Sequence, residues 1–185
     1  LDMLEQARVK PDALGSEIVL DGMLRGDVTL SVPIGERPEG KVVIESDDLV
    51  VAVSELGEPF THVKGGAEYR LNEGLYTERL TGQILGDSVE ATVTVAGGRI
   101  EVVGQGHLQT ANVSHLISLG FDESQLYGKA VWSIVARSTD QGLVWSLETD
   151  GQGLGSRLPE PLGKTEDQIG RIVVNLNSTP ELRSF

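Results

Sequence analysis

The stretch that decides the fold is Ser88–Val103, SVEATVTVAGGRIEVV, in which apolar and polar residues alternate up to a pair of glycines. Valine or alanine occupies every second position from Val89 to Val95, the pattern of a strand with one buried face. Gly97 and Gly98 supply the backbone freedom that a two-residue hairpin turn needs. That turn places Val95 opposite Ile100, so the apolar sides of both strands coincide. The stretch therefore predicts an antiparallel hairpin.

A second hairpin is predicted over Ala130–Thr149, where the same alternation runs on both sides of Asp140-Gln141-Gly142. A turn centred on Asp140 and Gln141 places even positions of the first strand opposite odd positions of the second. Trp132 and Trp145 then both face inward and act as core anchors. The alternative is a sugar-stacking platform, which requires an exposed indole.

The same test predicts further strands, and turns rich in Gly, Pro, Asp and Ser join them. One all-β domain over residues 1–185, a β-sandwich of about ten strands, is the natural solution. A tight turn at Asp47 separates two of the further strands. The further strands are expected at Glu17–Leu20, Val28–Val32, Lys41–Glu45, Leu49–Ser54, Thr77–Leu85 and Ile169–Asn177.

Three segments depart from the strand pattern. A short crossover helix is expected at Val113–Leu119, capped by Asn112 and ended by Gly120. Leu1–Lys10 has a helical pattern that Pro11 ends, and residues 1–12 are interpreted as an N-terminal arm. Residues 151–168 show no period and are expected to form a long irregular loop that is functional or meets a neighbour.

The charge is strongly acidic, with 28 Asp and Glu against 15 Lys and Arg and a net charge of −13. The carboxylates are scattered, which indicates a property of the whole surface. Such a surface repels phosphate backbones, so direct nucleic-acid binding is not expected. Because lysine is rarer than arginine and aromatic residues make up only 4%, we also form the hypothesis of a halophilic source. The ordinary solvated surface is the competing interpretation.

The chain has no cysteine, which excludes disulfides and thiolate chemistry. The longest fully apolar run, Leu49–Val53, is far shorter than the roughly 20 residues that span a bilayer, so a soluble domain is expected.

The sequence contains no strong motif for catalysis, phosphate binding or metal binding. Gly163-Lys164-Thr165 resembles the end of a phosphate-binding loop, but Leu158 stands where that loop needs a glycine. His62, His107 and His115 show no metal-binding spacing and are interpreted as structural. A triad of His, Ser and carboxylate assembled in space stays open, although no Gly-x-Ser-x-Gly elbow occurs. We expect no catalytic residue, cofactor or metal.

Acidic pairs and glycosylation triplets carry little information in this composition. Asp47-Asp48 and Asp122-Glu123 leave a surface calcium site open. The triplets beginning at Asn112 and Asn177 fit the N-glycosylation pattern, which arises often by chance.

As a small, acidic, cysteine-free β-domain with one crossover helix and an arm, the chain resembles the single jelly-roll major capsid proteins of icosahedral, internal-membrane-containing viruses of halophilic archaea. The resemblance implies a single jelly roll, a place in the virion shell and no catalysis. It also implies homodimers, and heterodimers with a second major capsid protein, in pseudo-hexameric capsomers. Neighbouring capsomers, minor capsid proteins and the internal viral membrane are the further implied partners.

On this hypothesis, low salt should dissociate the assembly, because the acidic subunits would no longer be screened. The rival is a secreted β-sandwich module that binds a carbohydrate or another ligand.

Overall fold

The computed structural model describes residues 6–9, 18–34, 38–53, 58–117, 125–139 and 142–178. It is nearly all β, with a 13-stranded antiparallel sheet, and this confirms the predicted all-β class. The strands are β1 (Gln6–Val9), β2 (Ile18–Gly22), β3 (Arg25–Ser31), β4 (Glu39–Val53), β5 (Phe60–Arg70), β6 (Gly74–Thr77), β7 (Leu80–Ile84), β8 (Asp87–Ala96), β9 (Arg99–Gln109), β10 (Leu126–Thr139), β11 (Gly142–Thr149), β12 (Leu154–Ser156) and β13 (Ile172–Ser178), with helix α1 (Thr110–Ile117) between β9 and β10.

From β4 onward, strands that follow one another along the chain mostly lie side by side in the sheet. The order is β1-β2-β4-β5-β6-β8-β9-β10-β11-β13, while β3 pairs with β4, and β12 with β10. Two short strands, β6 and β7, lie one after the other between β5 and β8, because each of them pairs with both of these longer strands. The described strands therefore form an antiparallel meander.

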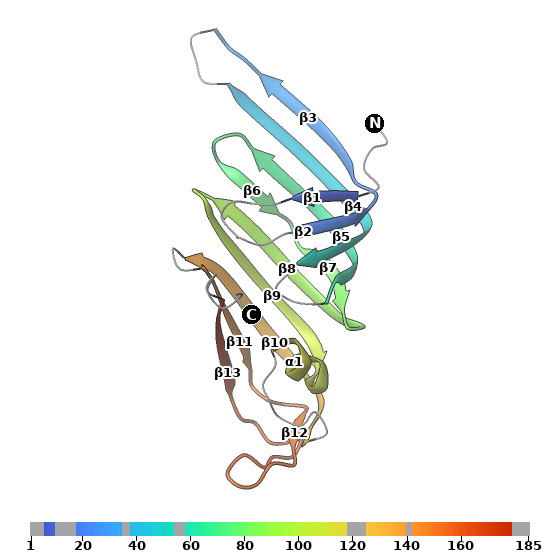
Figure 1. Ribbon diagram of the computed structural model, residues 1–185, viewed down its shortest axis with the longest axis vertical. Coiled ribbons are helices and arrows are strands. Elements are labelled where there is room, and N and C mark those ends of the chain that lie inside the picture. The colour runs from blue at the N-terminus through green and yellow to red at the C-terminus, as the bar shows by residue number, and fades with distance from the viewer. Residues whose placement is uncertain are drawn as a thin grey trace, which may run out of the picture.

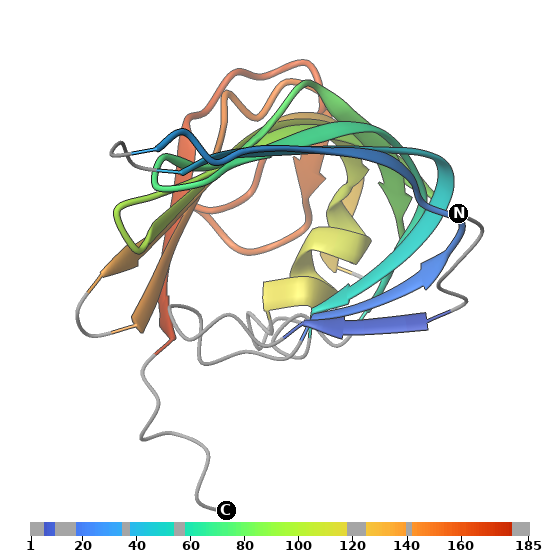
Figure 2. The same cartoon turned by 90° about the horizontal axis from the view of Figure 1, so that it is seen from above.

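The sheet is long and strongly curved. β3 and the start of β4 reach one end of the long axis, and the turn after β12 reaches the other (Figure 1). Seen along that axis, the strands form an arch, and α1 lies on its concave side (Figure 2). The sheet thus has a concave and a convex face, and only part of the concave face lies beneath the helix.

The core lies where α1 meets the concave face. Val113 of α1 is 1% exposed, and Leu108 of β9 and Trp132 of β10 are each 2% exposed. The other buried members of this cluster are Ile84, Ala130, Leu147 and Leu154, and Trp145 packs against it partly buried. The prediction that the tryptophans are core anchors is confirmed for this end of the molecule.

Both predicted hairpins form with the expected register. Val95 pairs with Ile100 across Gly97 and Gly98, which both have positive φ angles. In the second hairpin, even positions of β10 lie opposite odd positions of β11, as when Ala136 pairs with Trp145. The turn residues Asp140 and Gln141 lie outside the described residues.

Two strand predictions are wrong in their division of the chain. Glu39–Val53 is one strand, not two, and Asp47 lies inside it. Its register with β5 shifts between Ser46 and Leu49, so a bulge rather than a turn accommodates the acidic pair. Conversely, the strand expected over Thr77–Leu85 is divided between β6 and β7.

The prediction of a helix at the N-terminus is wrong for the residues that the structure describes. Gln6–Val9 forms β1, which pairs with β2, so part of the expected arm belongs to the sheet.

The predicted cap of the crossover helix is also wrong. α1 begins at Thr110, so Asn112 lies inside it and does not cap it; Gly120 lies outside the described residues. In the described part of the chain, no helix is long and apolar enough to cross a membrane.

The expected loop at residues 151–168 is more ordered than its sequence indicates. It contains β12, which pairs with β10, and a bridge between Ser156 and Lys164. These contacts lie within the chain, and the expectation that the loop is functional or meets a neighbour stays a prediction.

Candidate functional site

The two faces of the sheet differ sharply in chemistry. Residues paired across antiparallel strands point to the same face, so the register assigns each side chain. One row across the concave face is Val28, Val42, Tyr69, Leu75, Val95 and Ile100. A second row is Leu80, Ala91, Gly104, Ile134, Leu147 and Val174.

The convex face carries the charges. One row across it is Val43, Glu68, Tyr76, Thr94, Glu101 and Arg137. Because neighbouring positions on one strand alternate between these faces, the period-two pattern of the sequence separates a charged outside from an apolar inside.

The concave face is uncovered at the β3 end. Val28 and Leu30 of β3 are 76% and 67% exposed, and Tyr69 of β5 is 42% exposed. At the α1 end, by contrast, Trp132 is 2% exposed. One continuous apolar face therefore runs from a closed core to an open region, and this open region of β3–β6 is the candidate site.

Asp87 lies at the closed end of this face, where the register places it opposite Ile84. It is 1% exposed. Its carboxylate accepts hydrogen bonds from Gln109 N at 2.7 Å and Asn112 Nδ2 at 2.8 Å, and it pairs with Lys129 Nζ at 2.9 Å. Burial by itself raises the pKa of Asp87, but these donors outweigh burial and hold the pKa below its ordinary value.

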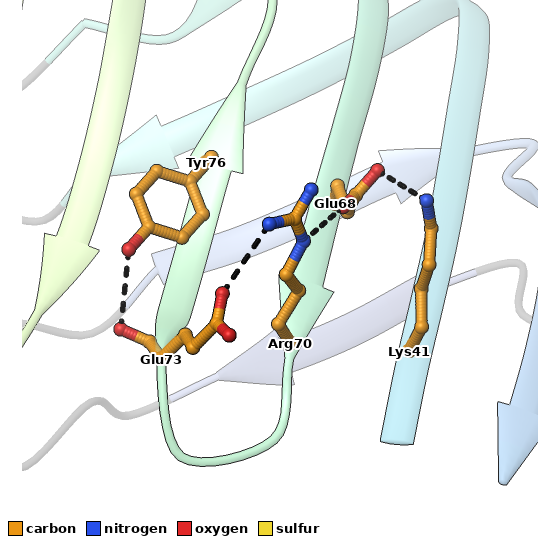
Figure 3. Close-up of polar contacts among 5 residues, drawn as sticks. All are labelled: Lys41, Glu68, Arg70, Glu73 and Tyr76. Carbon is orange, nitrogen blue, oxygen red and sulfur yellow. Dashed lines mark hydrogen bonds and ion pairs between the residues drawn. The ribbon is translucent and has the colours of Figure 1, made fainter. Parts of the chain in front are cut away.

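On the convex side of the open region, a polar cluster joins β4, β5 and β6 (Figure 3). Glu68 accepts from Lys41 Nζ at 2.7 Å and from Arg70, and Arg70 Nη1 lies 3.3 Å from Glu73. Tyr76 donates its hydroxyl to the backbone oxygen of Glu73.

The hydrogen bond from Lys41, followed by that from Arg70, lowers the pKa of Glu68. The bond to Glu68 raises the pKa of Arg70. The charges of this cluster therefore satisfy one another and hold neighbouring strands together, which is a structural role.

A broad convex hollow of about 690 Å³ brings together His62, His107 and Ser88. His62 Nδ1 lies 3.0 Å from Asp48 Oδ1, and no hydrogen bond links either histidine to Ser88 in the described part of the chain. Within the same residues, no three His, Cys, Asp or Glu side chains gather as a metal site. The hollow lacks the contacts of a catalytic triad. The His115 side chain and the pair Asp122-Glu123 lie outside the described residues.

Lys164, in the fragment that resembles a phosphate loop, has a structural role. Its Nζ donates to the backbone oxygens of Gly151, Leu154 and Thr165 at 2.6, 2.7 and 3.1 Å. The ammonium group is thus occupied by its own loop. No sequence pattern indicates this contact, since the three carbonyls are brought together by the path of the loop and by β12.

A sugar platform requires an exposed indole, whereas Trp132 is buried and Trp145 packs against the core partly buried. The apolar face was visible in the sequence as alternation, but its open end was not.

Comparisons with protein-family models, with curated proteins and with solved structures give no match to this chain. Its function is therefore inferred from the chemistry of the two faces of the sheet.

Proposed function

We propose that this protein binds an elongated apolar ligand, such as the acyl chain of a lipid, on the concave face of its sheet. The observation that carries the proposal is the apolar row from Val28 to Ile100, which continues into the exposed region at β3. Contiguous exposed apolar surface on a soluble protein marks a binding site. The shape of the sheet also favours an elongated ligand, because a long, curved apolar face fits an acyl chain better than a compact solute.

The energetics favour a ligand without charge along its length. Burying apolar surface stabilises a complex by roughly 25 cal/mol per Å² before the costs of association. A charged group on the same face would lose its hydration without a partner, because no described concave side chain of the open region carries a charge. A polar head group would therefore remain at the solvent edge.

Val42→Lys and Val43→Lys test this proposal as a matched pair. These half-buried neighbours on β4 point to opposite faces: Val42 pairs with Tyr69, whereas Val43 pairs with Glu68 on the charged face. We expect V42K to weaken the binding of a fluorescent fatty acid at least about tenfold, roughly 1.4 kcal/mol, because it places a cation beside the acyl chain. V43K should bind like the wild type.

Titration of the fatty acid's fluorescence measures both affinities, and circular dichroism checks that both variants fold. Equal loss in the two variants, or no saturable binding by the wild type, would contradict the proposal.

The capsid role and the jelly roll remain the alternative proposal, because they follow from the resemblance. The exposed apolar residues of β3, Val28 and Leu30, would suit a subunit covered by neighbours. However, a jelly roll joins strands by Greek-key crossings, and a meander of neighbouring strands fits an open ligand-binding sheet better. Native mass measurement at high salt separates the two: a large symmetric particle favours the capsid, and a small species that binds fatty acid favours the ligand.

A further inference from the structure

The edge strand β3 is exposed along its whole length. All seven of its residues are exposed, and in the described part of the chain it pairs only with β4. Its outer backbone N–H and C=O groups therefore face away from the sheet. On the concave side of the same strand, Val28 and Leu30 are 76% and 67% exposed. Natural proteins usually protect such edges, because an open strand with apolar side chains readily pairs with another strand.

The backbone groups along the β3 edge indicate which kind of partner can bind there. A lipid bilayer covers apolar side chains but offers no partner to the N–H and C=O groups of an edge strand. An added strand satisfies both requirements, because it pairs with the backbone and covers the side chains. The edge is therefore better suited to a β-strand than to a membrane surface.

We propose that β3 pairs antiparallel with β3 of a second copy of this chain, with the two-fold axis at Val28. This register uses the whole strand, since Arg25 then lies opposite Ser31 and Asp27 opposite Thr29. No like charges lie directly opposite each other. A two-fold axis perpendicular to the sheet keeps both apolar faces on the same side, so the concave face continues from one copy into the other. The inference concerns the edge of the sheet and does not depend on what the concave face binds.

The charges make this pairing salt-dependent. Each copy has a net charge of −13. The two Asp27 carboxylates lie on the diagonal of the pair, where neighbouring residues are about 7–8 Å apart. Salt near 1 M, with a Debye length of about 3 Å, screens this repulsion. Because one strand pair buries less than the roughly 800 Å² per partner of a standard interface, we expect a weak dimer that salt strengthens.

Val28 offers a charge-swap test, because it faces itself across the axis. V28K alone and V28E alone should each remain monomeric at high salt, since each places like charges opposite one another. An equimolar mixture of V28K and V28E should restore the dimer. Val131→Lys is the matched control, because Val131 is an exposed valine of β10, 55% accessible, away from this edge.

Sedimentation velocity at low and high salt measures these states, and thermal unfolding checks each fold. A wild type that stays monomeric at high salt overturns the proposal. A V28K protein that dimerises like V131K also overturns it, since the contact would then lie elsewhere.

A cross-link tests the register itself. The chain contains no cysteine, so Val28→Cys introduces a single thiol that can meet only its symmetry mate. Directly opposite residues have Cβ atoms about 4.5–5.5 Å apart, near the range that a disulfide accepts. We expect rapid oxidation of V28C to a covalent dimer at high salt and slow oxidation of the control V131C. Equal rates would exclude this register.

Discussion

Asp87 shows how one buried residue can hold several elements together. It begins β8, yet its carboxylate is bonded by Gln109 at the end of β9, Asn112 of α1 and Lys129 of β10. Without these partners, a carboxylate in this core would lose its hydration uncompensated. The contact thus fixes α1 at the closed end of the concave face.

Asp87→Asn should lower the free energy of unfolding by about 1–3 kcal/mol at neutral pH, because it removes charge-assisted hydrogen bonds to a buried group. Since the folded pKa of Asp87 is lowered, its contribution is fully present above the ordinary aspartate pKa of about 4 and is lost as pH falls through the folded pKa. The difference between the wild type and D87N should therefore be constant from pH 7 to about 4 and shrink below that.

Urea unfolding at several pH values measures this difference. Asp21→Asn on the exposed side of β2 is the control and should change stability little. A D87N protein as stable as the wild type at pH 7 would contradict the structural role of the network.

At the scale of elements, the two hairpins were the most predictable part of the fold. Gly97 and Gly98 both adopt positive φ angles, of 57° and 75°, as the hairpin pattern requires. The positions at which a strand is interrupted were less predictable. Asp47 looked like a turn because Asp favours turns, but tertiary pairing on both sides of β4 absorbs it in a bulge.

Gly74 and Gly98 give a matched prediction on backbone geometry. Both have positive φ, but a Cβ at Gly74 would lie 1.8 Å from the Val95 backbone oxygen, whereas a Cβ at Gly98 meets nothing within 4 Å. G98A should therefore cost only the conformational strain, about 1 kcal/mol. G74A should cost clearly more, because β6 must move away from β8.

Thermal unfolding of the two variants provides the comparison. Equal midpoints would show that β6 does not approach β8 as closely as this contact requires. Amide hydrogen exchange on Leu75 and Tyr76, the β6 residues paired with β8, should also increase in G74A and not in G98A.

At the scale of the whole molecule, an open apolar face is combined with a net charge of −13. Apart from the buried Asp87, the charged side chains of the described strands point to the convex face, while the apolar rows lie inside the arch. Ion pairs such as Lys41 with Glu68 and Arg137 with Glu101 neutralise part of the convex charge. The remaining acidic excess repels itself, and this repulsion depends on the solution rather than on any one contact.

The thermal midpoint should therefore rise as salt increases from about 0.01 M to about 1 M, where the Debye length falls from about 30 Å to about 3 Å. A variant with Glu39→Gln and Glu45→Gln on β4 should show a smaller rise, because it carries less of the repelling charge. Scanning calorimetry at a concentration where the protein is monomeric measures both. A midpoint independent of salt would contradict this electrostatic account and the halophilic hypothesis.

The sequence by itself determined the all-β class, the two hairpins and their registers, and the division between apolar and charged faces. These features depend on local alternation and turn chemistry, which act between residues near one another along the chain. Only the tertiary structure decided that the strands form one curved meander, that Asp87 is bonded by groups of β9, α1 and β10, and that the concave face is open at β3. Those features depend on contacts between segments far apart in the sequence, which no local pattern records.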